Sequence, residues 1–140
     1  MKKYLDATPE SGKEFYVKFN GKGKVVMLNL LKFKTIADYS NLESIKPHND
    51  ISGKEAYQLY MDATLPELEK AGSQILFYGN SQSFIIGPEH EKWDAVLLVE
   101  HQSAEQFIAF SQNKDYLKTA GHRSAALEDS RLLPINQTID

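Results

Sequence analysis

The chain has no cysteine among its 140 residues. This absence excludes disulfides, thiolate zinc sites and cysteine nucleophiles, and it fits a reducing cytoplasm, where we expect the protein to be located. Long apolar runs are also missing, because no stretch approaches the ~20 apolar residues that a membrane helix needs. Lys2 and Lys3 are not followed by an apolar segment, so we expect neither a signal peptide nor a membrane partner.

Positive charge is not in excess, since the formal net charge is −3. This value argues against bulk nucleic-acid binding, and we interpret the lysine-rich first 34 residues as a solvated face. Arginine is scarce: fourteen of the sixteen basic residues are lysine, and only Arg123 and Arg131 are arginine. A lysine-rich chain that keeps arginine in one region indicates a need for the planar, forked guanidinium there.

Spacings typical of metal or phosphate sites are absent. The four histidines lie far apart, with no HxH or HxxxH pair, and Gly21–Gly23 is too short for a phosphate loop. We therefore expect no metal and no cofactor.

Patterns of apolar residues and of turn residues predict four strands and four helices. Ser52 with Glu55, and Ser103 with Gln106, have the spacing of capping boxes. Pro66 is expected to kink or split the helix that contains it. The predicted helices cover 9–19, 53–71, 103–111 and 114–127, and the predicted strands cover 24–34, 74–87, 93–101 and 129–135.

Both faces of the predicted strands 24–34 and 93–101 are apolar, whereas a strand with one solvated face would alternate. The order βαββαβ is that of a ferredoxin-like α+β domain, with helices on one face of a four-stranded antiparallel sheet. We expect one domain over 1–140, with residues 1–22 as an N-terminal helical extension. An uncovered apolar face is costly in water, so we expect a homodimer that packs sheet to sheet.

Asn29 is the one polar residue in the apolar stretch 25–31. A buried amide without partners costs about 1–3 kcal/mol, so either neighbouring groups satisfy it or it faces a cavity and binds a substrate oxygen. Tyr57 and Tyr60 lie on one helical face. Either they pack in the core, or one hydroxyl points into a pocket.

Trp93 opens a predicted strand as a core residue or a pocket wall. Near the last strand, Asp129 and Arg131 share a strand face and can pair bidentately. With His122 and Arg123, they form either a structural clamp or a site. In the second interpretation, Arg123 or Arg131 anchors a substrate carboxylate and His122 acts as an acid–base group.

Four segments resemble one family, the domain of unknown function 1330 family: VVMLNLLKFK (25–34), SGKEAYQLYMDATLPELEKAG (52–72), IGPEHEKWDAVLLVEH (86–101) and HRSAALEDSRLLP (122–134). The resemblance implies a ferredoxin-like fold within the dimeric α+β barrel superfamily. That superfamily contains cofactor-free monooxygenases, haem-degrading enzymes, isomerases and ligand-sensing domains, whereas the family itself has no established activity. Haem-degrading relatives use an asparagine, a tryptophan and a histidine. Asn29 and Trp93 match two of these, but His101 ends a strand instead of lying on the following helix.

We therefore expect a homodimeric small-molecule-binding protein, as a cofactor-free enzyme or a binder, that takes a small organic acid or carbonyl compound. The expected pocket lies between helix 53–71 and the sheet, near Asn29, Tyr60, Arg123 and Arg131. The alternative is a non-catalytic ligand-sensing or interaction module, in which these polar residues only hold the fold.

Overall fold

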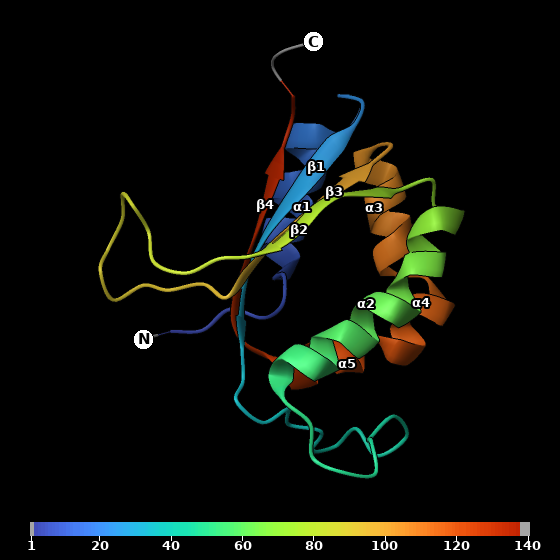
Figure 1. Cartoon of the computed structure of the whole chain (residues 1–140). Coiled ribbons are helices and arrows are strands. Elements are labelled where there is room, and N and C mark those ends of the chain that lie inside the picture. The colour runs from blue at the N-terminus through green and yellow to red at the C-terminus, as the bar shows by residue number, and fades with distance from the viewer. Residues whose placement is uncertain (1, 138–140) are drawn as a thin grey trace.

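The protein is described by a computed structural model that covers residues 2–137. Figure 1 shows the predicted order of helices and strands, with the last helical region divided into two short helices. The elements are α1 (Pro9–Phe19), β1 (Val25–Phe33), α2 (Gly53–Lys70), β2 (Gln74–Asn80), β3 (Ala95–His101), α3 (Ala104–Ser111), α4 (Lys114–Thr119), α5 (Gly121–Ala126) and β4 (Leu127–Ile135).

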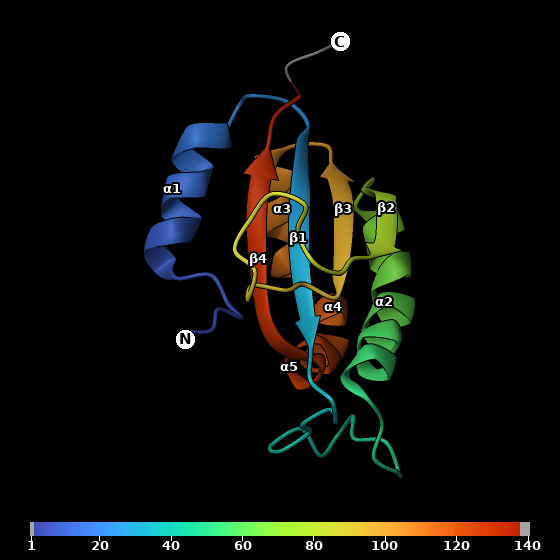
Figure 2. The ribbon, with the colours of Figure 1, turned by 60° about the vertical axis from the view of Figure 1, so that its left-hand side comes forward.

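The four strands form one antiparallel sheet in the order β2-β3-β1-β4. This order and the connections between the strands confirm the ferredoxin-like α+β arrangement. Helices α2 to α5 cover one face of the sheet, and α1 lies beside β4 (Figures 1 and 2). Among residues 2–137, no helix is long and apolar enough to cross a membrane.

The two apolar faces of the central strands have different neighbours. Val25, Met27 and Leu31 point toward the helices and are buried. The opposite face, which we call the outer face, carries side chains that no helix covers. Phe77 and Leu133 on this face are each 57% exposed; the half-buried residues beside them are Val26, Leu28, Leu30, Val96 and Leu98.

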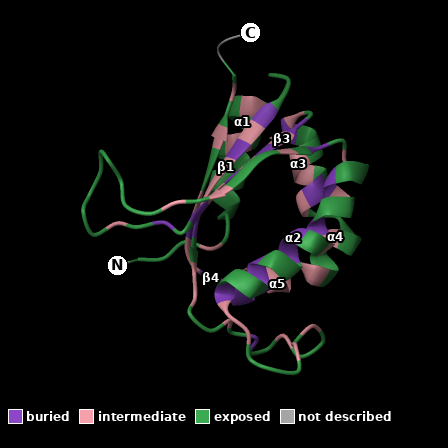
Figure 3. Cartoon of the chain, viewed as in Figure 1, coloured by how far each residue is buried: buried purple, intermediate pink, exposed green. Residues whose placement is uncertain are grey.

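Helix α2 continues through Pro66 as one helix, so of the two effects expected of this proline the split does not occur. A buried stripe that includes Tyr60 and Leu68 holds the helix on both sides of the proline. The predicted end of the second strand was wrong. The second strand ends at Asn80, not at 87. Residues 81–94 form an arm that leaves the sheet (Figures 1 and 2) and is exposed along most of its length (Figure 3). A single β-bridge, from Ser83 to Lys92, joins its two sides.

The backbone around Gly53 fixes one end of the helix layer against the sheet. The Gly53 N–H donates to Lys34 O at 2.9 Å, and the Lys34 N–H donates to Ala126 O at 2.8 Å. A side chain on Gly53 would collide with both of these carbonyl oxygens. The Ser52–Glu55 capping box at the start of α2 is present as predicted. This junction sets the gap between α2 and β1.

Candidate functional site

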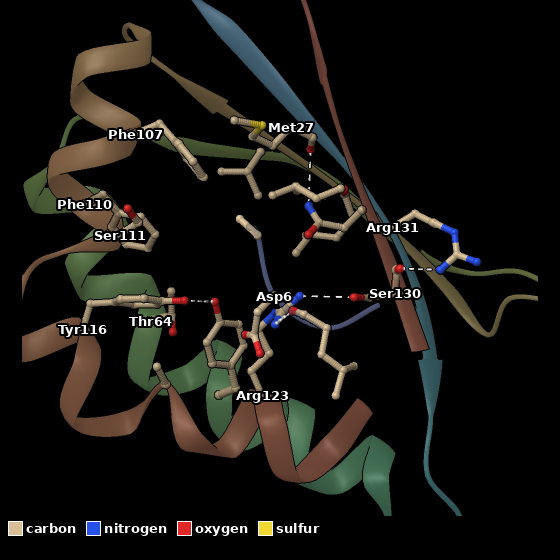
Figure 4. Close-up of a pocket in the computed structure, with 18 of the residues that line it drawn as sticks. Asp6, Met27, Thr64, Phe107, Phe110, Ser111, Tyr116, Arg123, Ser130 and Arg131 are labelled. Atoms are coloured by element: carbon tan, nitrogen blue, oxygen red, sulfur yellow. Dashed lines mark hydrogen bonds between the residues drawn. The ribbon is translucent and has the colours of Figure 1, made fainter. Parts of the chain in front are cut away.

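A cavity of about 700 Å³ lies between the sheet and the helices. Its floor is the helix-facing side of β1, β3 and β4, and its roof is formed by α2, α3, α4 and α5 (Figure 4). The N-terminal segment 4–7 and α1 form a further wall, with Phe15 packed against Phe107 at 5.5 Å between ring centroids. The cavity is mostly apolar, so its few polar groups determine what it can bind.

Asn29 supplies one polar group on the floor, at the middle of β1. Its Nδ2 donates to Leu97 O at 3.2 Å and to Met27 O at 3.4 Å. Within the part of the chain that the structure describes, no group donates to its Oδ1. Backbone carbonyl oxygens therefore accept from the amide N–H groups of Asn29, as the first interpretation expects, and a role in binding a substrate oxygen stays a prediction.

Helix α2 directs hydroxyl groups into the cavity from the roof. Tyr57, Tyr60 and Thr64 line it at the spacing of one helical face. The Tyr60 hydroxyl lies 2.8 Å from that of Tyr116 on α4. Burial raises the pKa of Tyr60 well above its usual value, so its hydroxyl is uncharged. Thr64 is 3% exposed, and its Oγ1 has no hydrogen-bond partner among residues 2–137.

Arg123 carries the positive charge of the site. From α5 its Nη1 donates to Leu5 O at 2.7 Å, and its Nη2 donates to Ser130 Oγ at 3.4 Å. Both acceptors are neutral, and none of the described carboxylates forms an ion pair with Arg123. Burial raises the pKa of Tyr57, and the nearby charge of Arg123 opposes that rise. Asp6 on the same wall is exposed.

His101 lies at the far end of the cavity, at the last residue of β3. It is 2% exposed. Its Nδ1 lies 2.7 Å from the Oγ of Ser73, and its ring packs against Phe107 and Phe110 at 5.0 and 5.7 Å. Burial lowers the pKa of His101 to about 4, so the imidazole is neutral at physiological pH.

Two other residues proposed from the sequence direct their charged or ionisable groups elsewhere. The Nδ1 of His122 is 2.7 Å from the hydroxyl of Tyr39, and His122 is not among the residues that line the cavity. Arg131 is among them, but its guanidinium pairs with Asp129 at 2.8 Å and points away from the cavity (Figure 4). It stacks on the ring of Trp93 at 5.0 Å, so this group lies on the outer face.

The asparagine, tryptophan and histidine of the haem-degrading relatives are thus not brought together. Asn29 and His101 face the cavity, whereas Trp93 lies beneath Arg131 on the opposite side of the sheet. Across residues 2–137, no cluster of three or more potential ligands could hold a metal ion.

Sequence reasoning missed His101 and Thr64 as cavity residues. Thr64 belongs to the predicted buried stripe of the helix, and His101 continues the inward-facing alternation of Ala95, Leu97 and Val99. The signal was therefore present in the periodicity. The contact with Ser73 gives no such signal, because tertiary packing brings the turn before β2 to the end of β3.

Comparisons with known proteins place this fold in a family. A protein of unknown function from Rhodopseudomonas palustris is 29% identical, with 99% of this chain and 100% of that chain covered and a TM-score of 0.86. A methylated form of that protein gives a TM-score of 0.87 at 29% identity, over 99% and 98% of the two chains. A structure from Bacteroides fragilis, described as a dimeric protein of unknown function with a ferredoxin-like fold, is 13% identical, covers 85% and 99%, and has a TM-score of 0.45.

No curated protein is significantly similar to the chain. The family model described as domain of unknown function (DUF1330) matches residues 46–135. This range includes the cavity residues Tyr60, Thr64, His101 and Arg123, but not Asn29. The chain belongs to the DUF1330 family.

Proposed function

We propose that the protein binds a small organic acid in this cavity, with the carboxylate at Arg123 and the apolar body along the sheet. The observation that carries the proposal is the charge of Arg123, which faces the cavity and has only neutral partners among residues 2–137. A partly buried guanidinium without a counter-ion favours an anionic ligand, because charge-assisted hydrogen bonds are about twice as strong as neutral ones. The fork of Arg123 retains N–H groups for a carboxylate.

The walls of the cavity suit an apolar ligand body. Side chains that contribute apolar surface come from both the sheet and the helices: Met27, Leu97, Val99, Met61, Leu68, Phe107 and Phe110. Transfer of a ligand's apolar surface into this space contributes about 25 cal/mol per Å². The volume of about 700 Å³ lies within the range of small-molecule pockets.

The two arginines give a matched pair of variants that test the anchor. Arg123→Gln removes the charge inside the cavity, whereas Arg131→Gln removes a charge on the outer face. We expect Arg123→Gln to weaken the binding of octanoate and 4-phenylbutanoate by about tenfold to a hundredfold, the value of one charged hydrogen bond. Isothermal titration calorimetry measures the affinities.

Arg131→Gln should leave these affinities within about twofold of the wild type, because the guanidinium of Arg131 pairs with Asp129 and points away from the cavity. Circular dichroism at the titration temperature checks that both variants are folded. Equal effects of the two substitutions, or no effect of either, would remove Arg123 as the anchor.

We also propose that two copies associate through the outer face. Its central residues Leu28, Leu30, Val96 and Leu98 have no helix above them, and Phe77 and Leu133 at its margins are largely exposed. A contiguous apolar surface of this kind is typical of an interface. A second copy of the same face is self-complementary under two-fold symmetry.

Leu133→Glu places a charge on the outer face and should shift the protein from dimer to monomer. Light scattering coupled to size exclusion measures the mass at low micromolar concentration. Val17→Glu is the control, because Val17 is 70% exposed on α1, away from the sheet. A wild-type protein that is monomeric under these conditions would contradict the association.

A further inference from the structure

The cavity has a second polar pole, at the end opposite Arg123. His101 lies opposite Val25 on β1, and Ser130, which accepts from Arg123, lies opposite Leu31. These positions are six residues apart along β1, a distance of about 20 Å. The two polar groups therefore stand at the two ends of one elongated space.

Helix α2 spans the same length on the roof. It begins at Gly53, which is bonded to Lys34 at the Arg123 end, and it is followed by Ser73, which contacts His101. Tyr60 and Thr64 lie between these ends. A ligand that extends from Arg123 along β1 and α2 therefore reaches His101.

The contact with Ser73 determines which nitrogen of His101 is available. Ser73 is buried, and among the described residues its hydroxyl has His101 Nδ1 as its only partner. If Nδ1–H donated to Ser73, the serine proton would be left without an acceptor, which is costly in a buried site. Ser73 therefore donates to Nδ1.

The proton of the neutral imidazole then resides on Nε2. Burial holds the pKa of His101 near 4, so the ring stays neutral and carries this single N–H. Within residues 2–137 no group accepts a hydrogen bond from Nε2. His101 thus carries one uncharged donor, and the residue lines the far end of the cavity.

We propose that the acid bound at Arg123 carries an uncharged oxygen acceptor toward its other end, and that this acceptor receives a hydrogen bond from Nε2–H of His101. This inference rests on the proposed function, since it assumes a carboxylate at Arg123. The ligand class is a medium-chain oxo acid, in which an apolar chain separates the carboxylate from a ketone. Ser73 is a positioning residue, because it acts through the tautomer of His101.

The test uses pairs of acids that differ only in the ketone. The two poles are roughly 20 Å apart along β1, and the side chains of Arg123 and His101 cover part of that distance. Straight-chain acids of about eight to fourteen carbons bracket the length that remains. Each acid is compared with its counterpart that has a ketone at the penultimate carbon, by isothermal titration calorimetry. We expect at least one oxo acid to bind about threefold to tenfold more tightly than its parent, the effect of one neutral hydrogen bond.

Two variants assign this preference to the His101 pole. His101→Phe keeps an aromatic ring but removes the donor, so the oxo acid and its parent should bind equally. Ser73→Ala should reduce the preference, and ¹⁵N NMR of the imidazole should show the Nε2–H tautomer in the wild type and a mixture in Ser73→Ala.

The outcomes separate this inference from the proposed function. If no parent acid binds, the proposed function itself fails. If the parent acids bind through Arg123 but no oxo acid is preferred, or if the preference survives in His101→Phe, the inference about His101 is wrong and the acid site stands. An Nδ1–H tautomer in the wild type would also overturn it.

Discussion

The burial of His101 has a thermodynamic consequence at the scale of a single residue. The folded state holds the pKa of His101 near 4, below its usual value of about 6.5 in an unfolded chain. Between these values the unfolded chain binds more protons than the folded one. The contribution of the neutral His101 to the free energy of unfolding is therefore fully present above about pH 6.5. This contribution is lost as the pH falls toward 4, with a slope of up to about 1.4 kcal/mol per pH unit.

His101→Gln should flatten this slope, because glutamine does not titrate. Urea denaturation at several pH values between 4 and 7 gives the free energy of unfolding for each variant. The exposed His48 is the control, and His48→Gln should keep the wild-type slope. Wild type and His101→Gln with the same pH dependence would show that His101 titrates normally in the folded state.

The sequence allowed some cavity residues to be predicted and not others. Asn29 interrupts an apolar stretch, and Tyr60 belongs to the apolar stripe of its helix. The face of the strand or helix on which each residue lies could therefore be inferred. Trp93 lies two residues before Ala95, so in an ideal strand both side chains would point to the inner face. The regular strand begins only at Ala95, however, and the chain before it turns to put Trp93 under Arg131.

At the scale of elements, the close approach of β1, α2 and α5 at Gly53 controls the width of the cavity. A methyl group on Gly53 would meet the backbone oxygens of Lys34 and Ala126, and backbone cannot move aside as a flexible side chain can. Gly53→Ala should therefore destabilise the protein by about 2 kcal/mol or more.

Gly12 on α1 provides the matched control, because a methyl group there would meet no atom within 4 Å. Gly12→Ala should stabilise the protein by up to about 1 kcal/mol through helix propensity. Urea denaturation measures both variants. A Gly53→Ala protein as stable as Gly12→Ala would contradict the packing described for this junction.

Most of the elements were predictable because their periodicity and caps are local. The exception at this scale is the arm at 81–94. Phe84, Ile85 and Ile86 are typical of a strand, and nothing local distinguishes them from the strand before them. Ile85 and Ile86 are nevertheless almost fully exposed, because the arm leaves the sheet after Asn80 and its two sides meet near its base, through Ser81 with Trp93 and Asp94 and through the bridge from Ser83 to Lys92.

At the scale of the whole molecule, the fold separates two apolar surfaces that the sequence presents as equivalent. One face of the sheet forms the floor of the cavity with the helices, and the other is the outer face, through which we propose that two copies associate. The alternation of the strands predicted both faces. The alternation could not predict on which side of the sheet each arginine side chain lies. Arg123 reaches the cavity from α5, whereas the Arg131 side chain lies on the outer face of β4.

The central claim is that the cavity selects a carboxylate, and the comparison of an acid with its amide tests it most directly. Octanoate and octanamide have the same chain and nearly the same shape, but only octanoate is charged. Isothermal titration calorimetry with the wild-type protein at pH 7 should show octanoate binding about tenfold or more tightly, because only the anion compensates the charge of Arg123. Equal affinities, or tighter binding of octanamide, would contradict the account.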